Sequence, residues 1–379
     1  MNYAEIKARL WEQIVSFART ELRDTEPVSA TTRSFPRQLW DRCGSFGIQG
    51  LSIPKHDGGL GYTASETAIV LEALGYGCNN NGLLASLAAH LLGCLLPIWK
   101  FGNEEQKRRY LPSLCNGSWI AAHGATEQQA GSDIFHLQTT AKRTEHGYVL
   151  NGTKTYILNA PVANILVVFA TVDPERGQEG ITAFIVERET PGISVARTIE
   201  TMGLQHALMG VLNFDNCLVP LEQRLGKEGA GPLIFQFSMG WERSLILASH
   251  LGTMRRVLEK CVSYARQREQ FGQQIGRFQS VSNLIADMKV RIEAGSLLLY
   301  QAADLLDRGK PNLLEAATAK LFLSESAVAT YLDAIRIHGA LGYTHDVEFA
   351  HDLQDAIGTL ILSGTSDMQR QIIARLLGV

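Results

Sequence analysis

YVLNGTKTYI (148–157), NILVVFATV (164–172) and ITAFIVE (181–187) establish the architecture of this 379-residue chain. Val, Ile, Thr and aromatic residues dominate the three runs, which is typical of β-strands. Turn residues such as Asp173-Pro174 separate them, and no helix of any length lies between them. We therefore predict that these strands pair antiparallel in a barrel or sandwich.

Helical patterns flank this β region on both sides. Apolar residues at helical spacing, such as Leu10, Ile14 and Phe17, predict an amphipathic first helix. After about residue 229, four long periodic segments with short Gly/Pro breaks indicate a helical bundle, its first helix beginning near Glu242. We predict an α+β multidomain fold with a helical domain at 1–120, an antiparallel β domain at 121–228 and a helical bundle at 229–379.

Composition excludes several classes of protein. Hydrophobic residues make up 45% of the chain, enough for a sizeable core. The net charge of −3 argues against a nucleic-acid binder, so we expect no nucleic-acid partner. The six cysteines are sparse and form no CxxC pair, and the ten histidines form no HExxH pattern. We expect a reduced protein without a metal site, and neither a Rossmann motif nor a P-loop is found.

One apolar segment, GLLASLAAHLLGCLLPIW (82–99), resembles a membrane span. It contains His90, and Gly93 and Pro97 interrupt it near its end. A buried helix of a large helical domain is the better interpretation. The N-terminus has no apolar run of a signal peptide. We therefore expect a cytoplasmic protein without a membrane partner.

Five local motifs follow one another across the three regions. They are ATEQQAGSD (125–133), LNGTKTYILN (150–159), REQFGQQIGRFQ (268–279), IHGALGY (337–343) and SGTSDMQRQIIARLLG (363–378). In this order the chain resembles the acyl-CoA dehydrogenase family over essentially its full length. Within the family it looks most like the branch of isovaleryl-CoA and prolyl-carrier-protein dehydrogenases.

The resemblance implies an FAD-dependent oxidation of a thioester. A carboxylate removes the α proton while hydride leaves the β carbon for the flavin. Because the α proton of a thioester is a weak acid, the base needs a desolvated position and the carbonyl oxygen needs hydrogen-bond donors. Desolvation also raises the pKa of a carboxylate towards that of its target.

The resemblance indicates Glu242 as this base. Most relatives carry a glutamate directly before the GTS of the last motif, where this chain has Ser363. The isovaleryl branch carries its glutamate at the position of Glu242. The ordinary alternative is a structural glutamate in a first helical turn, favoured by the helix dipole and paired with Arg243. For Ser363 we expect the backbone N–H to contact the thioester carbonyl, so that loss of the hydroxyl has a mild effect.

Two sets of contacts carry over from the family by position. The predicted substrate contacts are Ser132, Met239, Arg243, Ser363 and Gly364. The predicted FAD contacts are Ala125, Thr126, Gly131, Ser132, Tyr156, Ile157, Leu158, Arg268, Phe271, Gln279, Arg336, Gly339, Ala340, Thr365 and Asp367. Arg268, Phe271 and Gln279 match residues that reach the FAD of a neighbouring subunit, so we expect a homodimer or homotetramer.

Several features leave the function open at this point. Leu158 replaces the Thr or Ser that usually bonds flavin N5, and Tyr156 is alternatively a strand aromatic of the β core. We favour an aminoacyl or acyl thioester on an acyl or peptidyl carrier protein in a natural-product pathway. The alternatives are a short or branched acyl-CoA as substrate, and O₂ or an electron-transfer flavoprotein as acceptor. A non-catalytic flavin-binding scaffold is the remaining alternative, because Leu158, Gln205-His206 and Ser363 depart from the family pattern.

Overall fold

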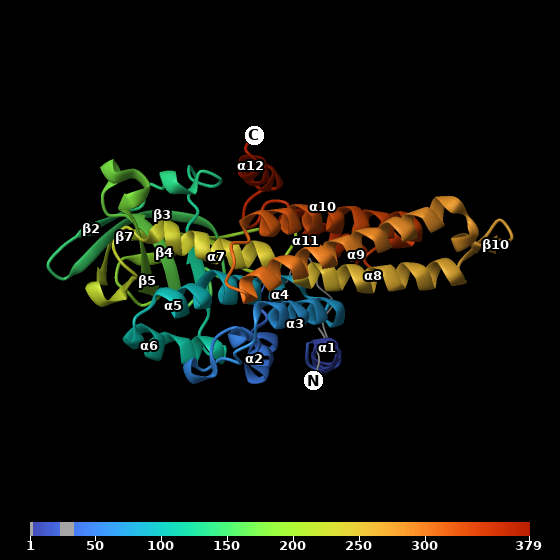
Figure 1. Cartoon of the computed structure of the whole chain (residues 1–379), viewed down its shortest axis with the longest axis horizontal. Helices are drawn as coiled ribbons and strands as arrows, with labels where there is room; N and C mark the ends of the chain where they lie inside the picture. Colours follow the sequence, from blue (N-terminus) through green and yellow to red (C-terminus); the bar gives the residue numbers. More distant parts are fainter. Residues whose placement is uncertain (1–2, 23–33) are drawn as a thin grey trace.

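Helices form the first part of the chain in the computed structural model, which describes residues 3–22 and 34–379 (Figure 1). The spacing predicted from Leu10, Ile14 and Phe17 is confirmed, since all three side chains are buried on one face of the first helix. The helices are α1 (Tyr3–Glu21), α2 (Arg37–Phe46), α3 (Ala64–Gly77), α4 (Asn81–His90), α5 (Leu96–Phe101) and α6 (Glu104–Cys115). The short turns are the 3₁₀ segments η1 (Ile48–Gly50) and η2 (Lys55–Asp57) and the π-helical η3 (Leu91–Leu95).

An eight-stranded sheet follows. Its strands are β1 (Ala121–Gly124), β2 (Thr140–Arg143), β3 (Gly147–Leu158), β4 (Ile165–Thr171), β5 (Ile181–Glu187), β6 (Ile193–Ile199), β7 (Met209–Pro220) and β8 (Arg224–Leu225). They lie in the order β6-β7-β3-β2-β4-β5-β8, with β1 paired to β4. Short helical turns η4 (Ile134–His136), η5 (Pro174–Gly180) and η6 (Leu221–Gln223) connect them.

Most of these pairings are antiparallel, as predicted, but the sheet is mixed. β1 runs parallel to β4, with Ala121 opposite Ile165, and β2 meets β4 parallel at Thr140 and Thr171. The prediction of a wholly antiparallel sheet is wrong at these two contacts. A parallel pair needs a long crossover connection, and the β2–β3 hairpin between β1 and β4 supplies one.

Helices form the rest of the chain. They are α7 (Gly231–Leu245), α8 (Ala248–Gln267), α9 (Gln279–Asp307), α10 (Leu313–His338), α11 (Phe349–Thr359) and α12 (Ser366–Leu377). A small hairpin of β9 (Glu269–Gln270) and β10 (Gln273–Gln274), the turn η7 (Ile275–Arg277) and the turn η8 (Leu341–Tyr343) complete the chain. The predicted three-part α+β architecture is thereby confirmed.

The start of the bundle differs from the prediction. No helix begins at Glu242, because α7 already starts at Gly231 with Pro232 in its first turn and ends at Leu245. A break at residues 246–247 separates it from α8. Glu242 therefore lies in the last turn of a helix, not in the first turn of one.

Two glycines allow the first helical region to pack tightly on the bundle. A Cβ at Gly75 of α3 would lie 1.8 Å from the carbonyl oxygen of Ser249, and one at Gly252 of α8 would lie 1.8 Å from that of Glu72. Arg256 then donates to the carbonyls of Gly75 (2.6 Å) and Cys78 (2.7 Å) at the C-terminal end of α3. Because α3 and α8 touch through their backbones, the two helical regions share one continuous hydrophobic core.

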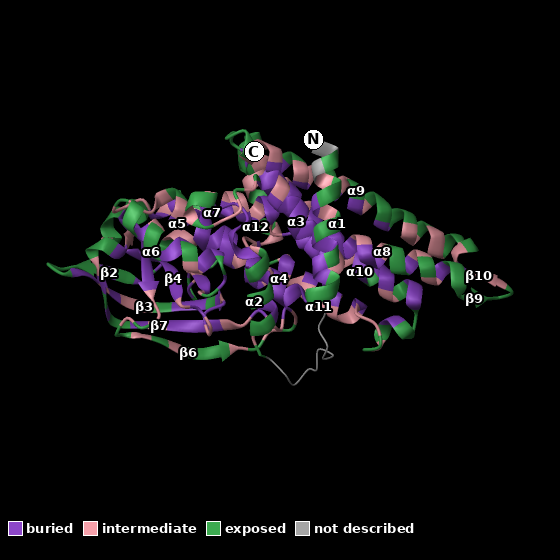
Figure 2. Cartoon of the chain, turned by 90° about the horizontal axis from the view of Figure 1, so that it is seen from below, coloured by how far each residue is buried: buried purple, intermediate pink, exposed green. Residues whose placement is uncertain are grey.

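The apolar segment predicted to be a buried helix is part of this core (Figure 2). Among the described residues, one helical stretch, Asn81–Phe101, is long and apolar enough to cross a membrane. However, 83% of its most apolar window is buried inside the protein. Contacts with neighbouring helices and the sheet therefore account for its composition, as they do in the core helix of any large domain.

The cysteines form no disulfide. All six have free thiols and are buried. Burial raises the pKa of Cys115 to about 12 and that of Cys217 to about 11, so these thiols are unreactive at neutral pH. Within residues 3–22 and 34–379, no group of three or more His, Cys, Asp or Glu side chains is arranged to hold a metal ion.

Candidate active site between the sheet and the bundle

A cavity of about 720 Å³ lies where the sheet meets the helical bundle. Its walls come from β1, β3, the loop at 125–134, α7, α11 and the turn at 362–365. Its volume is in the range of small-molecule and cofactor sites, and its surface is mainly apolar with a few polar groups. The cavity is therefore the best candidate for an active site among the described residues.

Glu242 presents a buried carboxylate to this cavity. Its Oε2 accepts a hydrogen bond from the hydroxyl of Ser363 at 2.5 Å. Burial raises the pKa of Glu242 to about 7, although the Ser363 hydroxyl and the charge of Arg243 both act to lower it. A pKa near the operating pH suits a general base, because the ionised form is accessible and still basic enough to take a proton.

The position of Glu242 corrects the electrostatic expectation for this residue. A first-turn glutamate would have been stabilised as an anion by the helix dipole. Near the C-terminal end of α7 the dipole instead disfavours the anion. The dipole and the desolvation therefore act in the same direction, towards a raised pKa.

The π-helical turn η3 makes room for this carboxylate. A Cβ at Gly93 would lie only 2.8 Å from Oε1 of Glu242, and the thiol of Cys94 is near enough for the carboxylate to raise its pKa. Any side chain at position 93 would push the carboxylate out of place. Irregular π turns inside helices are common at functional sites, and here the turn lies against the charged group.

The turn that carries Ser363 is held from three sides. Ser363 and Gly364 have positive φ values of 54° and 93°, and Gly364 suits the second because it has no Cβ. Lys320 donates to the Gly364 carbonyl at 2.7 Å, Gln369 donates to it at 3.0 Å, and Arg243 donates to the Ser363 carbonyl at 3.4 Å. These bonds hold the Ser363 hydroxyl against the carboxylate of Glu242.

A buried ion pair supports the opposite wall. Lys154 donates to Glu127 at 2.8 Å and to the carbonyl of Ala125 at 3.0 Å, and burial lowers its pKa to about 8. The N–H of Thr155 donates to the carbonyl of Thr126 at 2.9 Å. The loop that begins at Ala125 is thereby fixed to β3, so both walls of the cavity are rigid.

This wall fits the flat ring of a flavin. Tyr156 has a φ of 58° and is 55% exposed, which is unusual for a strand aromatic and leaves its ring beside the cavity. The space around Gly131 is open, since a Cβ there would meet no atom within 4 Å. An exposed aromatic ring next to an open, glycine-containing loop offers a stacking surface and free backbone groups.

The cavity brings together much of the predicted site. Those of its lining residues that the sequence predicted are Ala125, Thr126, Gly131, Ser132, Tyr156, Ile157, Leu158, Met239, Glu242, Arg243, Ser363, Gly364 and Thr365. Thr365 also caps α12, since its hydroxyl accepts the N–H of Met368 at 3.1 Å. The remaining predicted residues do not line the cavity.

Three of these remaining residues lie at the far end of the bundle. Figure 1 shows the β9–β10 hairpin at the tip of α8 and α9, away from the sheet. Arg268 directly follows the last residue of α8 beside this hairpin, Gln279 begins α9, and both are exposed. Phe271 is 95% exposed at the tip. Within one chain these side chains cannot contact a molecule in the cavity.

The other four occupy the surface. Arg336 forms an ion pair with Asp333 at 2.9 Å, and Asp367 forms one with Arg370 at 3.2 Å. Exposed positions after the end of α10 carry Gly339 and Ala340. None of these four lines the cavity, although Asp367 lies between Thr365 and Met368, which do.

Sequence reasoning missed several residues around the cavity. His123 and Phe235 line it, and Lys320 and Gln369 hold the turn at Ser363. His123 stands two residues before the ATEQQAGSD motif, which is a signal that was available. Lys320 is a buried lysine in an apolar stretch of α10, but its hydrogen-bond partner is 44 residues away and no local pattern identifies it.

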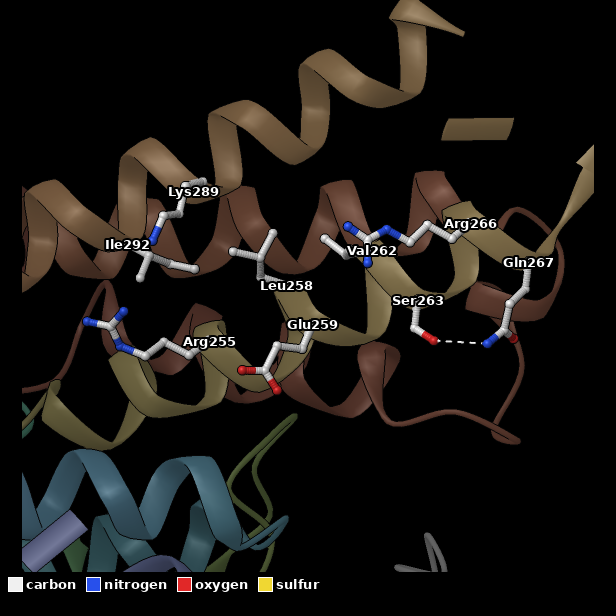
Figure 3. Close-up of a pocket in the computed structure, with 9 residues that line it drawn as sticks. All are labelled: Arg255, Leu258, Glu259, Val262, Ser263, Arg266, Gln267, Lys289 and Ile292. Carbon is white, nitrogen blue, oxygen red and sulfur yellow. Dashed lines mark hydrogen bonds between the residues drawn. The ribbon is translucent and has the colours of Figure 1, made fainter. Parts of the chain in front are cut away.

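A second hollow of about 620 Å³ lies between α8 and α9 (Figure 3). Figure 3 shows charged and polar side chains along it, including Arg266, Lys289 and Glu259, and a hydrogen bond of 3.2 Å from Gln267 to Ser263. Arg255 there is already paired with Glu72 at 2.6 Å. The hollow has no buried carboxylate and none of the predicted site residues, so it is a poor candidate for the active site.

Three models of one protein family together match nearly the whole chain. The N-terminal domain of acyl-CoA dehydrogenase matches residues 5–118. The middle domain of acyl-CoA dehydrogenase matches residues 122–217, and the C-terminal domain matches residues 229–378.

Individual proteins are similar over the same length. The L-prolyl-[peptidyl-carrier protein] dehydrogenase of Pseudomonas fluorescens is 44% identical over 345 residues, covering 91% of each chain. The crystal structure of the prolyl acyl carrier protein oxidase AnaB has a TM-score of 0.97 and 43% identity, covering 100% of both chains. The structure described as PigA with FAD and proline has a TM-score of 0.96 and 38% identity, covering 100% of this chain and 98% of the other.

Proposed function

The chain belongs to the acyl-CoA dehydrogenase family, and on this premise we propose that it oxidises a prolyl or similar aminoacyl thioester held on a carrier protein. As a member of that family it is a flavin oxidoreductase that uses FAD. The substrate proposal is supported by two relatives, which are named for prolyl groups on carrier proteins. The predicted domain limits, 1–120, 121–228 and 229–379, are part of the same proposal.

One observation carries the catalytic part of the proposal, namely the buried carboxylate of Glu242 with its pKa of about 7. We assign to this carboxylate the removal of the α proton of the thioester. Its ionised form accepts the proton, and the low polarity around it keeps it basic enough to do so. The short bond to Ser363 orients the carboxylate, so Ser363 acts as a positioning residue for the base.

FAD would bind along the wall formed by Ala125, Thr126 and residues 156–158. Bound FAD supplies the acceptor for the hydride that leaves the substrate. Tyr156 would pack beside its ring, and the open loop at Gly131 and Ser132 would contact its phosphates. Leu158 has no hydrogen-bonding side chain, so the donors at this edge would be backbone groups.

The residues at the tip of the bundle fit a second copy of the chain. We infer that Arg268, Phe271 and Gln279 contact the FAD of a neighbouring subunit, because they are exposed and remote from the cavity of their own chain. Arg268 would pair with a phosphate, for which a guanidinium is well suited. The same reasoning extends less directly to Arg336, Gly339, Ala340 and Asp367, which are also on the surface.

The electron acceptor is a choice between an electron-transfer flavoprotein and O₂. One relative is named a dehydrogenase and a structural neighbour an oxidase. The choice between these two acceptors depends on which substrate is confirmed. The substrate is therefore tested first. The second candidate substrate is a short or branched acyl-CoA, favoured by the family match.

The test is anaerobic reduction of the bound flavin by two panels of thioesters. One panel contains L-prolyl and other aminoacyl groups on a peptidyl carrier protein, and the other contains short and branched acyl-CoAs. We expect fast bleaching of the flavin by the prolyl carrier protein and slow bleaching by the acyl-CoAs. Efficient bleaching by the acyl-CoAs alone would overturn the substrate, and no bleaching by either panel would indicate a non-catalytic scaffold.

A further inference from the structure

The loop between β6 and β7, residues 200–208, forms one wall of the cavity. Its far end joins the wall proposed to hold the flavin, because the carbonyl of Leu208 accepts the N–H of Asn159 at 2.7 Å and Met209 pairs with Leu158. Five residues of the loop line the cavity, namely Thr201, Met202, Gly203, Leu204 and Ala207. The position of this loop therefore determines part of the shape of the cavity.

The backbone of the loop is strained at Leu204. Its φ of 53° is in the left-handed region, which a bulky side chain rarely adopts. The carbonyl of Leu204 accepts the N–H of Ala207 at 2.8 Å, which closes a turn within the loop. A Cβ at Gly203 would lie 2.5 Å from the carbonyl carbon of Gln354, so the loop also touches the backbone of α11. A strained conformation persists only where the surrounding contacts fix it.

The carboxylate of Asp355 on α11 makes the contact that reaches this strained residue. Its Oδ1 accepts the N–H of Leu204 at 2.5 Å, and its Oδ2 accepts the side-chain amide of Asn81 in α4 at 3.1 Å. Burial raises the pKa of Asp355 to about 6, so above that pH it accepts both bonds as an anion. The amide of Asn81 is itself fixed, since it donates to Asp352 at 3.0 Å and accepts the hydroxyl of Thr253 at 3.3 Å. Asp355 thus joins the loop, α4 and α11 at one point.

The start of α4 contacts the same loop in a second way. A Cβ at Gly82 would lie 2.9 Å from the backbone nitrogen of His206, so the two backbones are in contact. The side-chain amide of Asn80 bonds Nδ1 of His206 at 2.6 Å. That bond reaches a side chain of the loop, whereas Asp355 binds the loop backbone. Asp355 is therefore the contact best placed to hold the conformation of the loop.

We propose that Asp355 is a positioning residue that holds the β6–β7 loop against α11 and so fixes this wall of the cavity for substrate binding. The inference rests on the proposed function in one respect, because it takes this cavity as the place where the thioester is oxidised. Asp355 does not line the cavity, so it acts through the loop. Glu242 and Ser363 belong to other elements, and no hydrogen bond joins either of them to the loop in the described chain. Loosening the loop should therefore weaken substrate binding and leave the chemical step largely intact.

The first test measures hydrogen exchange in the FAD-loaded protein at pH 8, resolved to single residues by mass spectrometry. The reporter is the amide of Ala207, whose bond to the Leu204 carbonyl does not involve the mutated side chain. In Asp355→Ala we expect exchange at Ala207 to accelerate by about 10- to 100-fold, because loss of a bond to a charged group shifts the opening equilibrium by about that factor. Asp355→Asn keeps an acceptor for the Leu204 N–H and should show a smaller acceleration.

Asp346→Ala is the matched control, because it removes an exposed carboxylate three residues before the start of α11. It should exchange at Ala207 like the wild-type protein. Thermal unfolding shows whether each variant is folded, and if Asp355→Ala does not fold, Asp355→Asn decides the question. Wild-type exchange at Ala207 in the folded Asp355 variants would overturn the role of Asp355.

The second test separates binding from chemistry with L-prolyl on the peptidyl carrier protein as the probe. In Asp355→Ala we expect KM for anaerobic flavin reduction to rise about 10-fold while kcat changes by less than about threefold. A fall in kcat at unchanged KM would overturn the positioning role in substrate binding. If the prolyl carrier protein does not reduce the wild-type flavin, the proposed substrate fails, whereas exchange at Ala207 still decides whether Asp355 holds the loop.

Discussion

The two ends of the helical bundle differ in whether a single chain encloses the predicted site residues that lie there. At the sheet end, Glu242 and Ser363 are enclosed, bonded to each other at 2.5 Å and supported by Lys320 and Gln369. At the hairpin end, Arg268 and its neighbours are exposed and face away from the cavity. At the sheet end, burial raises the pKa of the Glu242 carboxylate. At the hairpin end, the guanidinium of Arg268 is exposed and available to another molecule. The difference is the one expected if, as proposed, the base is assembled within one chain and cofactor retention depends on a second copy.

The largest effect is expected from Glu242→Gln, which tests the proposed base at the sheet end. The amide keeps the size and can still accept the bond from Ser363, but it cannot take a proton. Flavin reduction by the carrier-bound substrate should slow by about 10²- to 10⁴-fold, with FAD content unchanged. Stopped-flow absorbance under anaerobic conditions measures it, with Glu145→Gln in the exposed β2–β3 turn as control. Near-normal reduction by Glu242→Gln would remove Glu242 from the role of base.

A double variant sharpens the same point. Since the Ser363 hydroxyl lies 2.5 Å from the carboxylate, a glutamate at position 363 can place its own carboxylate close to the same spot. Ser363→Glu in the Glu242→Gln background should recover part of the lost rate. A complete lack of recovery in a protein that retains FAD would argue that the two positions are not interchangeable.

The pH dependence of stability tests whether Glu242 is strained by burial. Its pKa is about 7 in the folded chain against an ordinary 4.5. Between these values the folded state holds a proton that the unfolded state has released, so the free energy of unfolding falls as pH rises from 4.5 to 7 and then levels off. At about 1.4 kcal/mol per pH unit, the loss is about 3 kcal/mol.

Glutamine has no proton to lose, so Glu242→Gln should gain about 3 kcal/mol on the wild-type protein between pH 4.5 and pH 8. Thermal unfolding of the two holoproteins across this range measures the gain as a widening difference in Tm. A difference in Tm that stays constant with pH would show that burial does not raise the pKa of Glu242.

Arg268→Ala tests the proposed contact between the hairpin end and the FAD of a second copy. Loss of a charge-assisted phosphate contact should weaken FAD binding by about 1.5–3 kcal/mol, while the single-chain fold is unaffected. The flavin-to-protein absorbance ratio after dilution to low micromolar concentration measures it. Arg266→Ala, also exposed and two residues earlier, is the control and should retain FAD. A monomer by light scattering that keeps stoichiometric FAD would contradict the assignment to a second copy.

The smallest expected effect belongs to Ser363→Ala, and here the structure revises the expectation from sequence. The resemblance predicts a mild effect because it assigns only the backbone N–H of Ser363 to the thioester, yet the hydroxyl donates to the proposed base and lowers its pKa. Without it the pKa of Glu242 should rise by about one to two units, since a bond to a charged group contributes about 1.5–3 kcal/mol. Flavin reduction should fall about sevenfold or more at pH 7 and recover as the pH is raised above the new pKa. Ser366→Ala should leave the pH profile unchanged, and an unchanged profile in Ser363→Ala would restore the original expectation.

Local patterns in the sequence were sufficient for the order of the three regions, and the family resemblance was sufficient to nominate Glu242 as the base. Strand and helix periodicity are properties of a few neighbouring residues, and the five motifs carry the family resemblance in the same local way. The wrong prediction of where the first helix of the bundle begins also came from a local pattern. The periodic pattern predicts a helix from Glu242 onwards, but the helix starts at Gly231, so Glu242 lies in its last turn instead of its first.

Packing between distant segments determined the acidity of Glu242, the contact with Ser363 and the position of His123. The carboxylate is desolvated because Gly93 and Cys94 lie against it from a π turn about 150 residues earlier, and Ser363 meets it from 121 residues later. A pKa depends on solvent exclusion and on charges in three dimensions, and neither is a function of sequence neighbours. For this reason the residue proposed as the base could be nominated from the sequence, while its raised pKa arises only from the fold.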